Sequence, residues 1–252
     1  MSVDKILWGL SSVGFAAFLV AIWHAVTAAG LVAPVFLPSP GAAFDALTAG
    51  FRSGTLSMVT LSTIERIFYG WVLASLLGVS IGTWIGLSHT AKVYLSPTLE
   101  LLRPLPASAA IPVAITFFGL SDAMVLVSVG FGALWPMLLA TAHGVADVDT
   151  RLNEVSRLLQ MSRWSYIRSI ALPNALPDIL GGMRVGLVVS LIITIVGEML
   201  ASREGLGQWV ILAARAFRSA DLYAGIILLG LIGLCSALLV TLVESRLLRW
   251  RK

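Results

Sequence analysis

One serine lies in a pattern associated with nucleophilic catalysis. Residues 78–82 read Gly-Val-Ser-Ile-Gly, which fits a nucleophile elbow, where the serine sits on a sharp turn from a strand to a helix. Here Ser80 lies inside a long apolar segment and has no evident base. Glycines recur at every fourth residue in two segments, Gly78, Gly82 and Gly86 in the first and Gly182 and Gly186 in the second. This spacing is typical of close packing between membrane helices, so we expect packing rather than an intramembrane hydrolase.

The other reactive residue types predict no catalytic or metal centre. His24, His89 and His143 lack metal-ligand spacing, and a single cysteine, Cys235, excludes both an internal disulfide and a cysteine metal site. No Gly-x-x-x-x-Gly-Lys-Ser/Thr loop occurs, so the phosphates of a nucleotide have no backbone cradle. We therefore expect no catalytic residue and no bound cofactor, and energy supplied by a partner or by an ion gradient.

The composition identifies the solvent that must surround these residues. Hydrophobic residues make up 58% of the 252-residue chain and charged residues 12%, whereas soluble domains carry about a quarter charged residues. The chain is therefore expected to be an all-α integral membrane protein in contact with lipid. Its net charge of +4 comes from basic residues spread over short loops, which membrane topology explains, so we expect no nucleic-acid partner.

Six segments are long and apolar enough to span a bilayer, because crossing takes roughly 20 residues as a helix. They are approximately 7–29, 67–88, 94–119, 123–143, 178–200 and 223–245. The third is interrupted by several prolines, the first is expected to be retained rather than cleaved, and 41–53 is expected to be amphipathic. The predicted organisation is an N-terminal helix with this amphipathic segment (1–54), a transmembrane domain (55–246) with a polar loop (144–177), and a basic tail (247–252).

The positions of the basic residues predict the orientation. With the N-terminus in the cytoplasm, twelve of the 17 lysines and arginines fall inside and five outside. Cytoplasmic loops hold the excess of positive charge. Both termini and the polar loop are therefore expected in the cytoplasm.

The polar loop has helical periodicity. Leu152, Val155 and Leu159 recur at the spacing of one helix face, which predicts an amphipathic helix over 150–160. Ser162 is placed to cap a second short helix, which we expect to end at Pro173 because proline lacks a donor. Two such helices would project from the membrane as a grip for a soluble partner; the alternative is a helix pair lying on the lipid surface.

At this point the loop resembles that of a known family, the inner-membrane permease subunits of type I ABC importers. Their cytoplasmic "EAA" loop reads Glu-Ala-Ala, three residues, Gly, nine residues, then Ile-x-Leu-Pro. Glu154 matches the first position and residues 170–173 match the tail, but Gln160 stands where the family has glycine. A glutamine in a left-handed turn costs about 1–2 kcal/mol, unless the first helix runs on to Met161. The resemblance implies an ATPase-coupling role for Glu154, Ser156, Gln160, Arg163, Trp164, Ile170, Leu172 and Pro173.

Further segments resemble the sulfonate, taurine and nitrate branch of these permeases, from about Ser57 to Glu244. They are Arg-Pro-Leu-Pro at 103–106 with Pro112, Ser-Arg-Trp at 162–164, Gly-Glu-Met-Leu at 197–200 and Gly-Leu-Gly at 205–207. The resemblance implies the type I importer permease fold and a homodimer in a bacterial inner membrane. It also implies two cytoplasmic ATPase subunits, which bind ATP and Mg²⁺ and receive the second loop helix in a groove, and an extracytoplasmic substrate-binding protein.

The substrate path has six candidate residues. Broken helices at membrane depth are tolerated beside a water-filled cavity, so the proline-rich segment is expected to border the path, with a packing kink as the alternative. Glu198 could line the path, act as a gate, pair with an arginine or cap the Gly205 loop. The candidates are Arg103, Pro104, Pro106, Ser108, Pro112 and Glu198.

Three classes of function make different demands on the sequence. An ATP-driven permease explains the polar loop and the missing nucleotide site. A proton- or ion-coupled carrier needs a relay of buried acids, which are nearly absent here, and a hydrolase needs a base for Ser80. The first is preferred, with Glu154 orienting the loop through a hydrogen bond or an ion pair. A sulfonate, taurine, nitrate, bicarbonate or a vitamin precursor are all compatible substrates.

Overall fold

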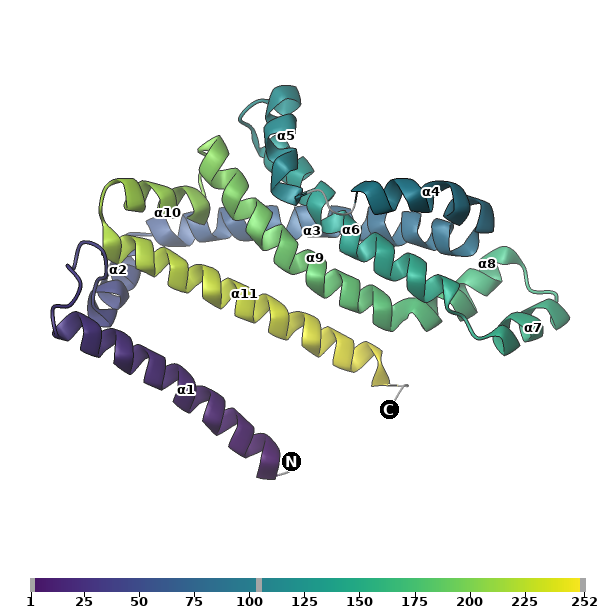
Figure 1. Ribbon diagram of the computed structural model, residues 1–252, viewed down its shortest axis with the longest axis horizontal. Helices are drawn as coiled ribbons and strands as arrows, with labels where there is room; N and C mark the ends of the chain where they lie inside the picture. Colours follow the sequence, from purple (N-terminus) through teal and green to yellow (C-terminus); the bar gives the residue numbers. More distant parts are fainter. Residues whose placement is uncertain (1–2, 103–105, 250–252) are drawn as a thin grey trace.

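The structure is a computed structural model that describes residues 3–102 and 106–249, without the side chains of residues 3–10, 13, 96 and 100. All secondary structure within these ranges is helical (Figure 1). The elements are α1 (Val3–Ala28), α2 (Pro40–Arg52), α3 (Thr55–Leu87), α4 (His89–Leu102), η1 (Ala107–Ala109), α5 (Ala110–Phe118), α6 (Asp122–Ala146), α7 (Thr150–Leu158), α8 (Arg163–Tyr166), the π turn η2 (Ile167–Ala171), α9 (Leu172–Ala201), α10 (Leu206–Arg215) and α11 (Ser219–Leu247). The expected all-α fold is confirmed.

The helix α6 is the centre of the bundle and packs closely against both α3 and α9. The two glycine stripes lie at these contacts. A Cβ atom at Gly82 would lie 2.6 Å from the carbonyl oxygen of Leu138, and one at Gly182 would lie 2.8 Å from that of Pro136. Both stripes therefore allow backbones to approach, as predicted, and Ser80 is an exposed residue of α3.

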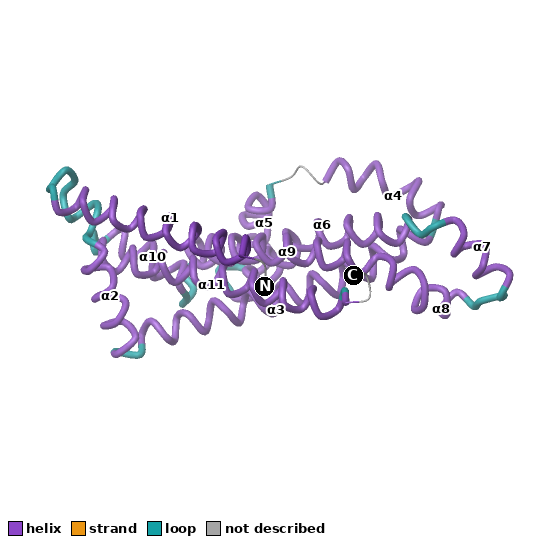
Figure 2. Tube along the Cα trace, turned by 90° about the horizontal axis from the view of Figure 1, so that it is seen from below, coloured by secondary structure: helices purple, strands orange, loops and turns teal. Residues whose placement is uncertain are grey.

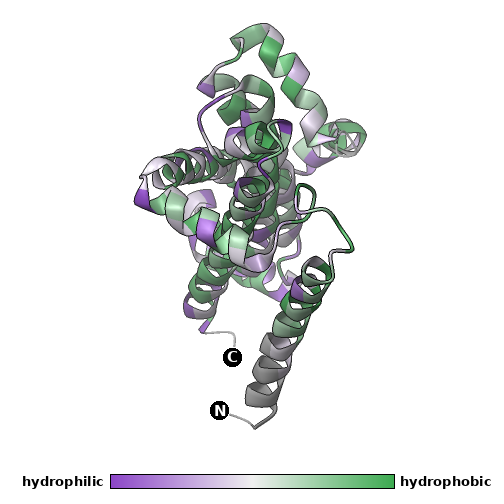
Figure 3. Ribbon diagram, turned by 90° about the vertical axis from the view of Figure 1, so that its left-hand side faces the viewer, coloured by the Kyte–Doolittle hydropathy of each residue, from purple (hydrophilic) through white to green (hydrophobic). Residues whose placement is uncertain are grey.

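Four helical segments within the described residues are long and apolar enough to cross a membrane. They are Thr55–Leu87, Asp122–Ala146, Arg163–Ala201 and Ser219–Leu247, with shorter apolar helices at Gly14–Ala28 and Ala107–Phe118. Hydrophobic residues cover much of their outer surface (Figure 3). Four of the six expected spans are thus confirmed at full length, and the segment 41–53, which was expected to be amphipathic, forms α2.

The expected single helix over 94–119 is wrong. The chain forms α4 and then a separate helical unit, η1 with α5, which projects from the bundle in Figure 1 and packs against α6 through Ile111 and Ala114. Pro106 precedes η1 with an extended ψ of 122°, because the proline ring fixes φ and its missing N–H cannot continue a helix. Arg103 and Pro104 lie outside the described residues.

The prediction that Pro173 ends the second loop helix is also wrong. The helical path runs from α8 through η2 into α9 and changes direction there (Figure 1). The amide of Leu172 donates to the carbonyl of Ile167, five residues back, and Pro173 follows in the first turn of α9, where a missing N–H is tolerated. The π turn therefore lets the chain pass through the proline without ending the helix.

The bundle has two different ends. At one end α7 and α8 extend beyond α3 along the direction of the long helices (Figures 1 and 2). At the other end lie α2 and α10, of which α10 was not predicted. The helix α1 contacts the rest of the chain mainly through α2, and its Trp23 ring lies 5.6 Å from the ring of Tyr223 in α11.

Candidate functional site

The turn that ends α7 has the geometry for which the family uses glycine. Gln160 has φ +48°, in the left-handed region. The amide of Gln160 donates to the carbonyl of Arg157 and that of Met161 donates to the carbonyl of Ser156, both at 3.0 Å. These are the two bonds of a Schellman motif. The alternative in which the helix runs on to Met161 is therefore wrong, and Gln160 carries the conformational strain.

Polar side chains hold the two loop helices together. The Oγ of Ser162 accepts from the amide of Ser165 at 3.2 Å, which confirms the predicted cap of α8. The hydroxyl of Tyr166 donates to Oδ1 of Asn153 at 2.5 Å, and Nδ2 of Asn153 donates to the carbonyl of Val148 at 3.3 Å. No local pattern predicts this pairing, because it joins residues of two helices whose relative position depends on the turn.

The apolar side of α7 faces outward. Leu158 is 83% exposed and Trp164 of α8 is 71% exposed, whereas the small polar Ser156 is buried. Exposed apolar residues on α7 and on the turn after it form one group, the outer apolar face: Leu152, Val155, Leu158 and Leu159. A helix that belonged to the core would bury this face, so the loop is built to be covered by something else.

The tail of the loop pattern lies against the bundle. Ile170 and Leu172 are half-buried and pack against a cluster that contains Val145 and Ala171. They anchor the loop on α6 and α9. Glu154 and Arg163 are exposed, and the Glu154 side chain makes no hydrogen bond or ion pair with any residue that the structure describes. The ion pair expected within the loop is therefore not found in this part of the chain.

At the opposite end, Glu198 is fully buried in a charged cluster. Its Oε1 accepts from Arg66 at 2.8 Å and its Oε2 from the amide of Gly207 at 2.9 Å. The hydroxyl of Thr63 lies 3.0 Å from both oxygens and accepts from the amide of Leu206 at 2.8 Å. The carboxylate thus joins α9 to α3 and to the first turn of α10. Pairing with an arginine and capping the Gly205 loop, two of the four roles considered, are both present in this geometry.

A second acid extends this cluster toward the surface. Asp122, at the start of α6, is 46% exposed and accepts from Arg66 at 2.9 Å and from Arg203 at 2.5 Å. The carboxylate of Asp122 raises the pKa of the Arg203 guanidinium above its ordinary value. Arg66 is the shared member, and an arginine inside an apolar helix is itself a signal that a counter-charge is needed. Its acidic partners could not be chosen from the sequence, because they lie on α6 and α9.

The long helix α3 sets the distance between the two ends. At about 1.5 Å per residue, Leu87 lies about 30 Å along α3 from Arg66, which is close to the thickness of a hydrocarbon core. The charged cluster and the end of α3 beside the loop are therefore separated by about the thickness of a hydrocarbon core.

The remaining candidates for the substrate path lie on η1 and α5, which pack against α6. Pro106, Ser108 and Pro112 are all exposed. None of these three residues is a hydrogen-bond partner of Glu198, whose carboxylate is held by α3 and the start of α10.

The arrangement of helices matches that of a solved transporter. It superposes on a chain of the inward-facing MetNI methionine ABC transporter with a TM-score of 0.64 at 19% sequence identity, over 79% of this chain and 96% of that chain. The fold is therefore that of an ABC importer permease.

Sequence comparison gives the family. Residues 74–249 match the family described as binding-protein-dependent transport system inner membrane component. The chain is 33% identical over 236 residues to the aliphatic sulfonates transport permease protein SsuC of Bacillus subtilis, covering 93% of this chain and 85% of that protein. It is 30% identical over 254 residues to the taurine transport system permease protein TauC of Escherichia coli, covering 96% and 92%. The chain belongs to this family and is a membrane-spanning ABC importer permease.

Proposed function

We propose that the α7–α8 loop lies in the cytoplasm and docks on a separate ABC ATPase subunit. The outer apolar face of α7 is the observation that carries this proposal. Covering apolar surface contributes about 25 cal/mol per Å², and α7 lies beyond the end of α3 (Figure 2). A soluble partner explains both facts better than a helix pair lying on lipid.

The first loop helix is the better docking element, although the sequence suggested the second. α8 covers only Arg163–Tyr166 and continues through η2 into α9. It is therefore too short to offer a partner a helix face of its own. α7 has the outer apolar face, and the exposed Glu154 lies on the same helix. Its carboxylate is available to a basic residue of the ATPase.

The energy source is assigned to the partner. We infer that this chain binds no nucleotide and catalyses no reaction, and that ATP and Mg²⁺ bind to the ATPase subunits. The absence of a Gly-x-x-x-x-Gly-Lys-Ser/Thr sequence supports this division. The distribution of lysine and arginine supports an inner-membrane protein with both termini in the cytoplasm.

A second copy of the permease completes the path in this proposal. The unit η1–α5 carries the exposed path candidates and also exposed large apolar residues, including Val113 and Phe117. Such a surface suits contact with a second permease across a central path. Substrate would arrive on an extracytoplasmic binding protein, and the names of the relatives support a small anionic or zwitterionic solute such as a sulfonate, taurine or nitrate.

A proton-coupled carrier is less well supported. Among the described residues, Glu198 is the one acidic side chain that is buried, and it is paired with Arg66. A relay needs several acids that exchange protons.

The test is reconstitution of the permease with an ATPase and a binding protein encoded beside it. We expect a transported solute to stimulate ATP hydrolysis and to accumulate inside vesicles. If uptake proceeds without any ATPase and follows an imposed proton gradient, the proposal is wrong.

A further inference from the structure

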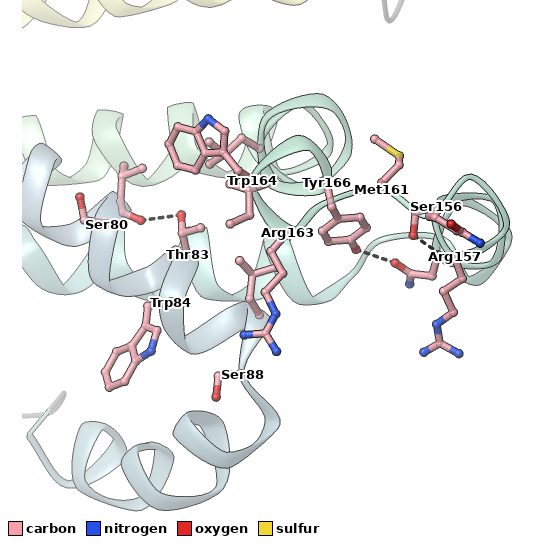
Figure 4. A pocket seen from close by; sticks show the side chains of 16 residues that line it. Ser80, Thr83, Trp84, Ser88, Ser156, Arg157, Met161, Arg163, Trp164 and Tyr166 are labelled. Atoms are coloured by element: carbon pink, nitrogen blue, oxygen red, sulfur yellow. Dashed lines mark hydrogen bonds between the residues drawn. The ribbon is translucent and has the colours of Figure 1, made fainter.

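A groove separates the end of α3 from the loop (Figure 4). Its volume is about 940 Å³. One wall is the last part of α3, from Val79 to Ser88, and the other is formed by residues of α7, the turn and α8. It is open to one side, and no residue of the outer apolar face lines it.

The lining of the groove is cationic. Arg157 and Arg163 contribute two guanidinium groups, and no aspartate or glutamate lines the groove. Neither arginine forms an ion pair with any residue in the described ranges. In Figure 4 both side chains extend to the same side, and that of Arg163 points toward Ser88. Unpaired guanidinium groups beside hydroxyls form a site for a phosphate.

The depth of the groove places it at a membrane surface. Along α3 the groove extends from Val79 to Ser88, about 20 to 33 Å from Arg66, so it spans the level where a hydrocarbon core about 30 Å thick would end. Trp84 and Trp164, one on each wall, are large and exposed, and tryptophan is enriched at this level of a bilayer. The deeper part of the lining is apolar and includes Val79, Ile167 and Leu172. The groove thus combines a cationic mouth with an apolar interior.

We propose that this groove binds an anionic phospholipid, with Arg157 and Arg163 forming the cationic mouth that attracts the headgroup and the apolar wall contacting the first part of an acyl chain. The inference rests on the proposed orientation, because anionic lipids face the cytoplasm and basic pockets between membrane helices bind their headgroups there. The lipid would bridge α3 and the loop. The position of the loop would then depend on the bilayer surface as well as on the Asn153–Tyr166 contact.

The test is a titration of the full-length permease in detergent with phosphatidylglycerol, followed by native mass spectrometry. The double variant R157Q/R163Q should bind about 30-fold more weakly, from about a factor of five for each arginine near a membrane surface. The matched control is R151Q/R168Q, which removes two exposed arginines of the same loop that do not line the groove. It should bind as the unmodified chain does. R157K/R163K keeps the positive charges and should retain most of the affinity. This variant distinguishes a loss of affinity caused by the missing charges from one caused by misfolding.

Three outcomes would overturn the proposal. The first is equal loss in the two glutamine variants, and the second is equal binding of phosphatidylcholine. The third is binding of inorganic phosphate as tightly as the lipid, which would identify a site for free anions. The lipid titration contains no ATPase, so its result does not depend on whether the loop docks on one. A permease that binds the lipid but fails to bind an ATPase would contradict only the docking proposal.

Discussion

The two ends of this permease arrange polar and apolar groups in opposite ways. At the α7–α8 end, leucines face outward and small polar groups such as Ser156 face the bundle. At the α2–α10 end, Glu198 is enclosed and fully hydrogen-bonded. The first arrangement leaves an apolar surface, and the binding of a partner that covers this surface is thermodynamically favourable. The second fastens helices to one another, because a buried charge is stable only with its partners.

The largest expected difference comes from making one substitution at both ends. Glu198→Gln removes a buried charge from Arg66, and we expect the free energy of unfolding to fall by about 3–5 kcal/mol. Glu154→Gln alters an exposed side chain and should change this free energy by less than about 0.5 kcal/mol, while reducing ATP-driven uptake. Thermal unfolding in detergent and uptake by vesicles measure the two effects. Equal stability losses would erase the contrast between the ends.

The outward leucines give the next largest effect. Leu158→Ala should weaken binding of the ATPase by about 1–2 kcal/mol, or roughly five- to 30-fold, because truncating a central interface side chain removes contact area. Leu31→Ala is the matched control, since Leu31 is also strongly exposed (74%) but lies near the other end. Copurification and surface-binding measurements report the affinity. If the control weakens binding as much, α7 is not the docking element.

The exposed part of the charged cluster should contribute less to the free energy of unfolding than its buried part. We expect Asp122→Asn to lower the free energy of unfolding by about 1 kcal/mol or less, because solvent screens a half-exposed ion pair. Thermal unfolding at low and high salt measures the effect, which should shrink as salt is added. A loss as large as that of Glu198→Gln would show that Asp122, rather than Glu198, fastens this end.

The smallest effect tests the strained turn. Gln160→Gly should raise the free energy of unfolding by about 0.5 kcal/mol, because relief of left-handed strain exceeds the added flexibility of glycine only slightly. Gln160→Ala should give no increase, since alanine has the same Cβ atom. An equal gain in both variants would mean that the glutamine side chain, and not the backbone, is the source of the strain.

Local signals predicted the loop well. The cap at Ser162 and the spacing of Leu152 and Val155 depend on neighbouring residues, and both helices begin where expected. The direction in which the apolar face points depends on how the loop packs against α6 and α9. This packing involves residues distant in the sequence, so no local pattern predicts it. Proline usually marks the end of a helix, so the continuation of the helix past Pro173 was not predicted. The π turn before Pro173 allows the helix to continue although proline has no N–H to donate.

Contacts between distant helices could not be predicted in the same way. Glu198 was singled out as a charge near a membrane surface, but its partners Thr63 and Arg66 come from a helix more than a hundred residues earlier in the chain. The helix α10 was missed because its start is defined by Gly207 donating to that same buried carboxylate. Both features follow from tertiary structure.

The π turn η2 makes α9 a lever arm. The helix is about 45 Å long at 1.5 Å per residue, and it runs from the pivot at Ile167–Ala171 to Glu198. A tilt of about 10° at the pivot would displace the far end by about 8 Å. The bonds of Glu198 to α3 and α10 oppose such a displacement. If a movement of the loop tilts α9, the stiffness of the charged cluster limits how far the end of α9 near Glu198 is displaced.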